Sequence, residues 1–192
     1  MPEITVAAPA PAPVAYVGGA EGAWAIERVE AVRGASLDPA PRLAVLDRAG
    51  PAPLPADAWT LRGVISHLRY ATSMERAELA AGSLPLGRPE ATCAALIPIR
   101  KSARWWGLAQ DERRAILAAQ SHHIAIGMEY MPAVARQLAH CRDLGEPWDF
   151  LTWFEFAPPD AGAFDQLLAR LRASEEWRHV EREAEVRLIR TA

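Results

Sequence analysis

Two adjacent histidines and an arginine stand out in the segment SHHIAIGMEYMPAVAR, residues 121–136. His122 and His123 are two of only five histidines in the chain, and Arg136 follows them inside an apolar stretch. Imidazole is the commonest protein ligand for metals, so one of the pair is a candidate metal ligand. The alternative is that one histidine packs or caps while the other faces solvent, because such a pair alone is weak evidence for a metal.

Lys101 is the only lysine among the 21 lysine and arginine residues of the chain. This bias is typical of a GC-rich coding background, in which arginine replaces lysine wherever charge alone suffices. The remaining lysine is either a chance survivor or the mark of a position that needs a compact ammonium group. A planar guanidinium does not fit every such position. Both interpretations stay open from composition alone.

Composition excludes several classes of protein. A chain of 192 residues with a hydrophobic fraction of 51% fits one domain with a sizeable core. The net charge of −3 and the pI near 6.0 argue against a nucleic-acid binder or a basic membrane-surface protein. No apolar run reaches the roughly 18 residues that would span a bilayer. Cys93 and Cys141 lack CxxC spacing, so we expect buried free thiols rather than a zinc site or a disulfide framework.

The N-terminal segment does not resemble a signal peptide. Glu3 stands where a signal peptide has lysine or arginine, and the prolines that follow interrupt any apolar helix. We therefore expect a cytoplasmic protein and leave a periplasmic location open. The Ala/Pro-rich residues 1–20 are predicted to be a flexible lead-in, followed by a single domain over residues 21–192.

Hydrophobic patterning and turn residues predict alternating strands and helices. Strands are expected at 23–34, 41–49, 59–72, 92–102, 134–144, 148–158 and 180–191, with a proline-rich loop at 50–58. Helices are expected at 73–82, at 109–127, where Gly127 and Pro132 end the helical spacing, and at 160–177. Because residues 145–147 join two strands as a hairpin, the pattern favours an α+β fold with an antiparallel sheet covered by helices.

These elements can bring His123 and Arg136 together although 13 residues separate them. Pro132 prevents one continuous helix, so the chain re-enters as a strand and the two side chains approach from different elements. On that strand, Arg136, Leu138 and His140 share one face. An arginine on a core-facing row requires an anionic partner, and the nearby sequence supplies no Asp or Glu. A bound ligand is therefore a candidate for the anionic partner of Arg136.

Three segments of the chain resemble the chlorite dismutase family of haem b proteins, and the short-subunit dimeric lineage in particular. They are LGRPEATCAALIPIRKSARWWGLAQDERRAIL at 86–117, SHHIAIGMEYMPAVARQL at 121–138 and RDLGEPWDFLTWFEFAP at 142–158. The similarity covers most of residues 60–190 and becomes faint before them. The resemblance implies a ferredoxin-like antiparallel sheet of the dimeric α+β barrel type, with helices covering the sheet, and a homodimer.

The resemblance also assigns the chemical residues. It implies one haem b per chain, with His123 as the ligand of ferric iron and His122 as a surface residue. Glu176 corresponds to the carboxylate that hydrogen-bonds the far nitrogen of the ligand, and Lys101 to the lysine that keeps this carboxylate ionised. The resemblance further implies that Arg136 is the distal arginine. It leaves Trp105, Trp106 and Tyr70 as either core residues or donors to the haem propionates.

The implied reaction is the decomposition of chlorite to chloride and dioxygen, through ferryl haem and retained hypochlorite, with Arg136 holding the anions. The main alternative is a coprohaem decarboxylase. Members of that group carry a tyrosine where this chain has Ile97 and usually a glutamine where it has Arg136. A further alternative is a haem-binding or sensing protein without turnover, against which the distal arginine argues.

Overall fold

Strands β1 to β8 close into an antiparallel barrel in a computed structural model, which describes residues 12–47, 59–65, 70–131 and 133–191. Around the barrel the strands follow the order β1-β3-β2-β8-β5-β7-β6-β4. Their bounds are β1 Ala12–Gly19, β2 Trp24–Arg33, β3 Arg42–Asp47, β4 Trp59–Ile65, β5 Cys93–Lys101, β6 Val134–His140, β7 Phe150–Phe156 and β8 Val180–Arg190. The predicted α+β class with an antiparallel sheet is confirmed.

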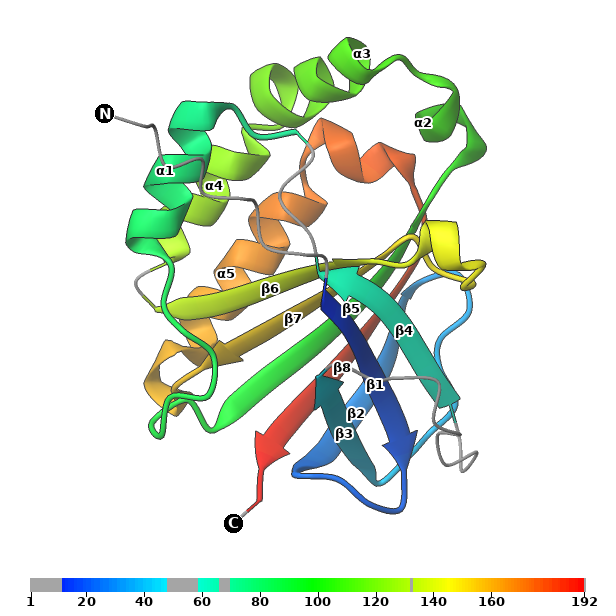
Figure 1. The fold of residues 1–192 in the computed structure, drawn as a ribbon, viewed down its shortest axis with the longest axis vertical. Coiled ribbons are helices and arrows are strands. Elements are labelled where there is room, and N and C mark those ends of the chain that lie inside the picture. The colour runs from blue at the N-terminus through cyan, green and yellow to red at the C-terminus, as the bar shows by residue number, and fades with distance from the viewer. Residues whose placement is uncertain (1–11, 48–58, 66–69, 132, 192) are drawn as a thin grey trace, which may run out of the picture.

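The helices lie on one side of this barrel. They are α1 Ser73–Gly82, α2 Ala103–Gly107, α3 Gln110–Ala115, α4 His123–Tyr130 and α5 Ala161–Arg172, with a π-helical turn η1 Ile116–Gln120 and 3₁₀ turns η2 Arg142–Leu144, η3 Pro158–Asp160 and η4 Glu175–His179. Figure 1 shows α1, α4 and α5 on the face of β6 and β7 that points away from β1–β4. In the part of the chain that the structure describes, none of the helices has the length and apolar character to cross a membrane.

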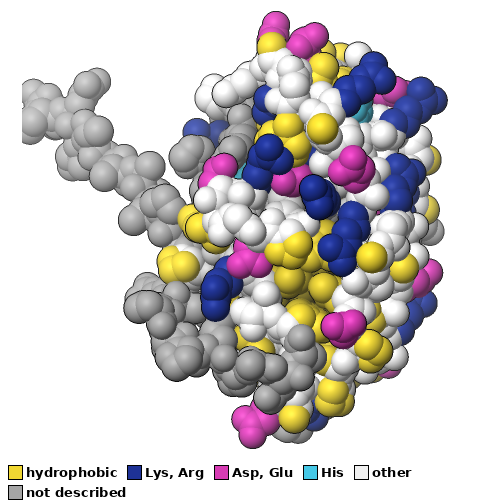
Figure 2. All heavy atoms as spheres, turned by 90° about the vertical axis from the view of Figure 1, so that its right-hand side faces the viewer, with side chains coloured by type: hydrophobic (Ala, Val, Ile, Leu, Met, Phe, Trp, Pro, Cys, Tyr) yellow, Lys and Arg dark blue, Asp and Glu magenta, His cyan; other side chains and the backbone are white. Residues whose placement is uncertain are grey.

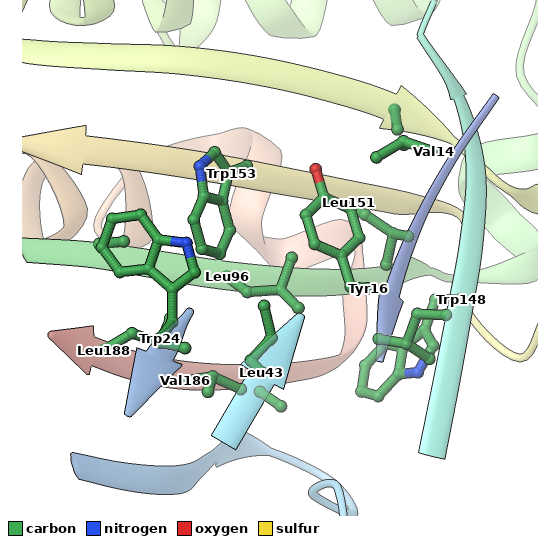
Figure 3. Close-up of a cluster of buried hydrophobic side chains, with 14 of the residues drawn as sticks. Val14, Tyr16, Trp24, Leu43, Leu96, Trp148, Leu151, Trp153, Val186 and Leu188 are labelled. Carbon is green, nitrogen blue, oxygen red and sulfur yellow. The ribbon is translucent and has the colours of Figure 1, made fainter. Parts of the chain in front are cut away.

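Strands β5 and β7 are buried on both faces, which explains their nearly continuous apolar sequence. Successive side chains alternate between two cores. Leu96 and Trp153 point into the barrel, where Tyr16 lies 5.6 Å from Trp153 between ring centroids (Figure 3). Ile97 and Phe154 point to the other face, where they pack beneath the helices. The site described below lies on this helix-covered face.

Exposed charged pairs contribute little to holding the barrel together. On the face shown in Figure 2, arginine side chains lie beside aspartate and glutamate. The Arg100–Glu181 pair, for example, is 3.8 Å apart, and more than half of each side chain is exposed. Exposed pairs of this kind contribute only about 0–1 kcal/mol each. Pairs of this exposed kind are therefore a minor part of what stabilises the barrel.

The predicted flexible lead-in is wrong for residues 12–19, which form strand β1 between β3 and β4. Val14 and Tyr16 point into the barrel and are almost completely buried. Burial of these side chains and pairing on both edges offset the weak strand propensity of an Ala/Pro-rich segment. Residues 1–11 and the predicted loop at 50–58 lie outside the described residues. So do residues 66–69 of the strand predicted at 59–72.

The helix predicted at 109–127 is broken rather than continuous. After α3 the chain forms the π-helical turn η1, and His122 then adopts the left-handed conformation with φ 50° before α4 begins at His123. Gly127 lies inside α4, so it does not end the helical segment, and Pro132 lies outside the described residues. The break is important because it sets the direction in which His123 enters the fold.

The other boundaries shift for local reasons. The helix predicted at 160–177 ends at Arg172, because the Ser174 hydroxyl donates to the Leu171 carbonyl and the chain turns into η4. The strand predicted at 134–144 ends at His140 and passes into η2, and Gly145 with φ 74° makes the turn toward β7. Both predicted thiols are free, with Cys141 buried and Cys93 half-buried.

Candidate functional site

A cavity of about 530 Å³ lies between the helices and the sheet. Its walls come from α1, α4 and α5 on one side and from β5, β6 and β7 on the other, and most of the lining side chains are apolar. This volume falls within the roughly 300–1,000 Å³ of small-molecule and cofactor sites. The proposed iron ligand, its two supporting residues and the distal arginine line it together: His123, Glu176, Lys101 and Arg136.

His123, Glu176 and Lys101 form one series of contacts. The Nδ1 atom of His123 lies 2.5 Å from Oε2 of Glu176, and the Lys101 ammonium donates to Oε1 of the same carboxylate at 2.7 Å. Glu176 and Lys101 are buried, with 5% and 4% of their surface exposed. Because the carboxylate occupies Nδ1, the Nε2 atom of His123 is the one left for a ligand in the cavity.

The charges in this series keep Glu176 ionised. Burial by itself raises the pKa of the Glu176 carboxyl. The charges of His123 and Lys101, together with their hydrogen bonds, outweigh burial and hold this pKa well below its ordinary value. A buried carboxylate that remains ionised is a strong acceptor for an imidazole N–H.

The residues at the break before α4 position both His123 and Glu176 for their contact. Left-handed His122, which is exposed as predicted, interrupts the helical path, and α4 begins at His123 on the cavity wall. The buried hydroxyl of Ser121 accepts a hydrogen bond from the Glu176 backbone N–H at 2.7 Å. This bond ties η4 to the start of α4. Sequence reasoning missed Ser121, because nothing local marks it as the partner of a residue 55 positions away.

The third member of the series is held from the strand side. Lys101 is the last residue of β5, and its backbone N–H donates to Oδ2 of Asp149 at 2.7 Å. Ser102 follows as the N-cap of the short helix α2, with its hydroxyl accepting from the Trp105 N–H. The end of a buried strand therefore fixes where the Lys101 side chain starts.

Arg136 lies on β6 with its accessible surface facing the cavity. Within the described residues its guanidinium has no ion pair, as expected for an arginine whose partner is a ligand. Burial lowers the pKa of Arg136, and the charge of Glu176 acts in the opposite direction. Leu138 and His140 line the same cavity, which confirms the predicted face of the strand.

The three aromatic candidates separate in the structure. Trp105 is 1% exposed and lines the cavity, and its Nε1 atom has no hydrogen-bond partner among the described residues. Tyr70 also lines the cavity, and its hydroxyl accepts from Arg113 at 3.2 Å. Trp106 does not line it. Its indole N–H donates instead to Asp149 at 3.0 Å, and its ring packs on Phe150 and on the Arg142 guanidinium.

Two further residues at the cavity were not found from the sequence. Arg76 reaches it from α1, where a single arginine on a polar helix gives no local signal. Trp177 follows Glu176, and its ring lies nearly parallel to the His123 imidazole, with 14° between the planes. The adjacency of Trp177 and Glu176 in η4 was the available signal, but it requires knowledge that η4 faces α4.

Comparisons with known proteins point to one family. The sequence profile of the family described as chlorite dismutase matches residues 46–190. A dimeric chlorite dismutase from Nitrobacter winogradskyi has a solved structure that superposes with a TM-score of 0.86 at 54% identity, covering 93% of this chain and 99% of that one. Chlorite dismutase of Candidatus Nitrospira defluvii, solved with imidazole, gives a TM-score of 0.57 at 26% identity, over 78% of this chain and 56% of that one.

A third relative is matched over a shorter length. Chlorite dismutase of Ideonella dechloratans is 35% identical over 78 residues, which is 41% of this chain and 25% of that protein. The chain thus spans a quarter of the Ideonella protein and about half of the Nitrospira chain, but nearly all of the Nitrobacter chain.

Barrel and cavity together define a class: an α+β barrel protein whose helix-covered face encloses an apolar cavity entered by one carboxylate-supported histidine. Within that class the profile match, which extends over more than half of the sequence, decides the family. The chain belongs to the chlorite dismutase family.

Proposed function

We propose that this protein binds one haem b per chain through Nε2 of His123 and decomposes chlorite to chloride and dioxygen. One observation carries the proposal. A histidine supported by the buried Glu176–Lys101 pair and an arginine without an ion pair among the described residues line the same apolar cavity. The first arrangement suits an iron ligand, and the second suits a small anion.

The cavity residues fit a haem. The walls are apolar, as the faces of a porphyrin require, and Nε2 of His123 would be the ligand of the iron. The Nε1 atom of Trp105, which has no hydrogen-bond partner among the described residues, and the hydroxyl of Tyr70 would donate to the propionates, and Arg76 supplies a positive charge on the α1 side. Trp106 is left out of this set, because Asp149 accepts its N–H. Bound ferric haem supplies the redox chemistry and the acceptor for an oxygen atom.

Arg136 supplies the anion chemistry. A guanidinium in a largely apolar cavity attracts chlorite more strongly than the same group in water. After one oxygen atom has left chlorite, the remaining hypochlorite is still an anion, and the planar fork of Arg136 can hold it with two N–H groups. Apolar neighbours such as Leu138 and Phe154 keep competing water away. Retention gives hypochlorite time to recombine with the oxygen atom that left chlorite, which yields dioxygen and chloride.

Ile97 argues against the coprohaem decarboxylase alternative. Its side chain lines the cavity and is 1% exposed, so this position offers an alkyl group where that reaction uses a phenol. The alternative of a haem-binding protein without turnover does not account for Arg136, since storage of haem needs no guanidinium in the cavity. Neither alternative uses all four polar groups.

The finer description of the fold belongs to the same proposal. In the C-terminal half the strands run β8-β5-β7-β6, which is the order fourth, first, third, second. In the N-terminal half they run β4-β1-β3-β2, which is the same order. Two sheets of ferredoxin-like order joined at β2–β8 and β4–β6 make a barrel of the dimeric α+β type. A homodimer, for which the dimeric Nitrobacter relative is the support, and a cytoplasmic location complete the proposal.

Oxygen evolution tests the proposed function. Haem-loaded protein supplied with chlorite in an oxygen electrode is expected to release one dioxygen and one chloride per chlorite consumed. A visible spectrum of the same sample is expected to show haem at one equivalent per chain. Haem-loaded protein that evolves no dioxygen from chlorite would contradict the assignment of the reaction.

Replacement of Glu176 by alanine is expected to raise the reduction potential of the bound haem. Without the carboxylate the imidazole loses anionic character and stabilises ferric iron less. Groups bonded to a metal ligand typically contribute ten- to hundredfold in affinity, and a loss of this size confined to ferric haem corresponds to a rise of about 60–120 mV for one electron. The neighbouring Glu175→Ala, which removes a surface pair with Arg178, is the control and should leave the potential in place. Equal potentials in the wild type and Glu176→Ala would make Glu176 purely structural.

A further inference from the structure

The Lys101 ammonium lies between two indole rings. Its Nζ atom is 4.9 Å from the ring centroid of Trp105 and 5.3 Å from that of Trp177, while it donates to Glu176. Both indoles are buried, with 1% and 6% of their surface exposed. Cations within about 6 Å of an indole face are attracted to it, most strongly where water is excluded. The two indole rings therefore help to position the ammonium group of Lys101, the only lysine of the chain.

Trp177 contacts both ends of the series His123–Glu176–Lys101. The Lys101 ammonium lies over the Trp177 ring. The His123 imidazole is the other neighbour, with 6.5 Å between the two ring centroids and nearly parallel ring planes. The edge of the ring is anchored elsewhere. Its Nε1–H donates to Oε2 of Glu183 at 2.7 Å, a bond within the buried core. The orientation of this ring is thus set by a carboxylate on β8.

Glu183 is a fully buried carboxylate that is itself held firmly. It has 0% of its surface exposed, and its Oε1 atom accepts from both Nε and a terminal nitrogen of Arg172, at 2.9 and 2.7 Å. Arg172, the last residue of α5, also donates to Glu185 at 2.7 Å. A buried charge is tolerated only when its partners are arranged in this way. The partners leave Oε2 of Glu183 for Trp177.

We propose that Glu183 is a positioning residue for the haem site that acts through Trp177. A carboxylate that accepts the indole N–H both fixes the ring and makes its face more negative, which strengthens its attraction for the Lys101 ammonium. Lys101 is then kept on Glu176, and Glu176 is kept on Nδ1 of His123. The inference rests on the proposed function, because the group it acts upon is the histidine ligand of the haem.

Glu183→Gln in the haem-loaded protein tests this inference. The glutamine retains the shape but removes the charge that faces Trp177. The rate of haem transfer to apomyoglobin should rise roughly three- to tenfold, less than for groups bonded directly to a metal ligand. The ferrous iron–histidine stretching band should shift. Glu185→Gln is the matched control, because it also removes a buried β8 carboxylate bound by Arg172, and the band should stay in place.

Two variant backgrounds test whether Glu183 acts on the haem site through Trp177 and Lys101. In Trp177→Phe, which keeps a ring but lacks the N–H donor, the band should already be shifted, and adding Glu183→Gln should change it no further. In Lys101→Met, Glu183→Gln should again leave the band unchanged. An unshifted band in Glu183→Gln, an equal shift in Glu185→Gln, or a full shift in the Lys101→Met background would each overturn the inference.

The same samples separate this inference from the proposed function. Wild-type protein that binds no haem, or that shows no iron–histidine band, would contradict the haem site itself. A normal wild-type band with no response to Glu183→Gln would leave the haem site intact and reject only the role of Glu183.

Discussion

His123→Ala is expected to lose nearly all of its haem. The cavity would still offer apolar walls, but the imidazole that would bind the iron would be gone. We therefore expect the haem dissociation rate to rise by more than the roughly hundredfold that loss of a group supporting the ligand costs. Transfer of haem to apomyoglobin, followed in the Soret band, measures this rate. The Glu176–Lys101 pair remains in this variant, so the fold should be retained in the haem-free protein.

His122→Asn is the matched control for this prediction. His122 is exposed and adopts a left-handed conformation, which asparagine tolerates better than most residues, so the start of α4 should be preserved. We expect wild-type haem content in His122→Asn. Equal loss of haem in both variants, or loss in His122→Asn alone, would show that the wrong histidine has been assigned.

Arg136→Ala is expected to leave the fold and haem content intact while it impairs the handling of anions. Removal of a preorganised charge from a site typically costs about a hundredfold or more in rate, and we expect about a hundredfold loss in kcat/KM for chlorite. Oxygen evolution should continue at this lower rate. More free hypochlorite should appear per dioxygen formed, and the haem should bleach sooner. A hypochlorite trap run beside the oxygen electrode measures both products.

Two further variants sharpen the test of Arg136. Arg136→Lys should recover only part of the loss, because a flexible ammonium lacks the planar fork of the guanidinium. Arg100→Ala removes an exposed arginine from β5 and should behave as the wild type does. Thermal melting distinguishes the competing explanation. If Arg136→Ala melts far earlier than the wild type yet releases no extra hypochlorite, Arg136 is a structural residue and the proposed mechanism is wrong.

The sequence allowed the site residues to be assembled chiefly through the family resemblance, which assigned them to one site, while their local features drew attention to some of them. Lys101 was the only lysine, and His123 and Arg136 stood in one short segment. The structure brings these residues and Glu176 to one cavity. Trp106 could not be separated from Trp105 in this way. Which of two adjacent tryptophans faces the cavity depends on Asp149, 43 positions away, accepting one of the two indole N–H groups.

Elements whose stability comes from distant pairing were harder to predict. Strand β1 is Ala/Pro-rich, and its propensity is low until β3 and β4 pair with both of its edges. The helical spacing between residues 109 and 127 continues across the π-helical turn η1, so periodicity alone did not reveal the break before His123. Ser121 and Glu183 were missed for the same reason. Their partners lie on other elements, and their local sequence gives no sign of the contact.

Oxygen-isotope labelling tests most directly whether hypochlorite is held in the cavity until it recombines. Wild-type haem-loaded protein would be supplied, in ordinary water, with chlorite that carries oxygen-18 at both positions. The dioxygen is then analysed by mass spectrometry. Retention beside Arg136 predicts dioxygen in which both atoms are oxygen-18. Dioxygen that carries predominantly one or no labelled atom would contradict the account, because it would mean that an oxygen atom had exchanged with water before the O–O bond formed.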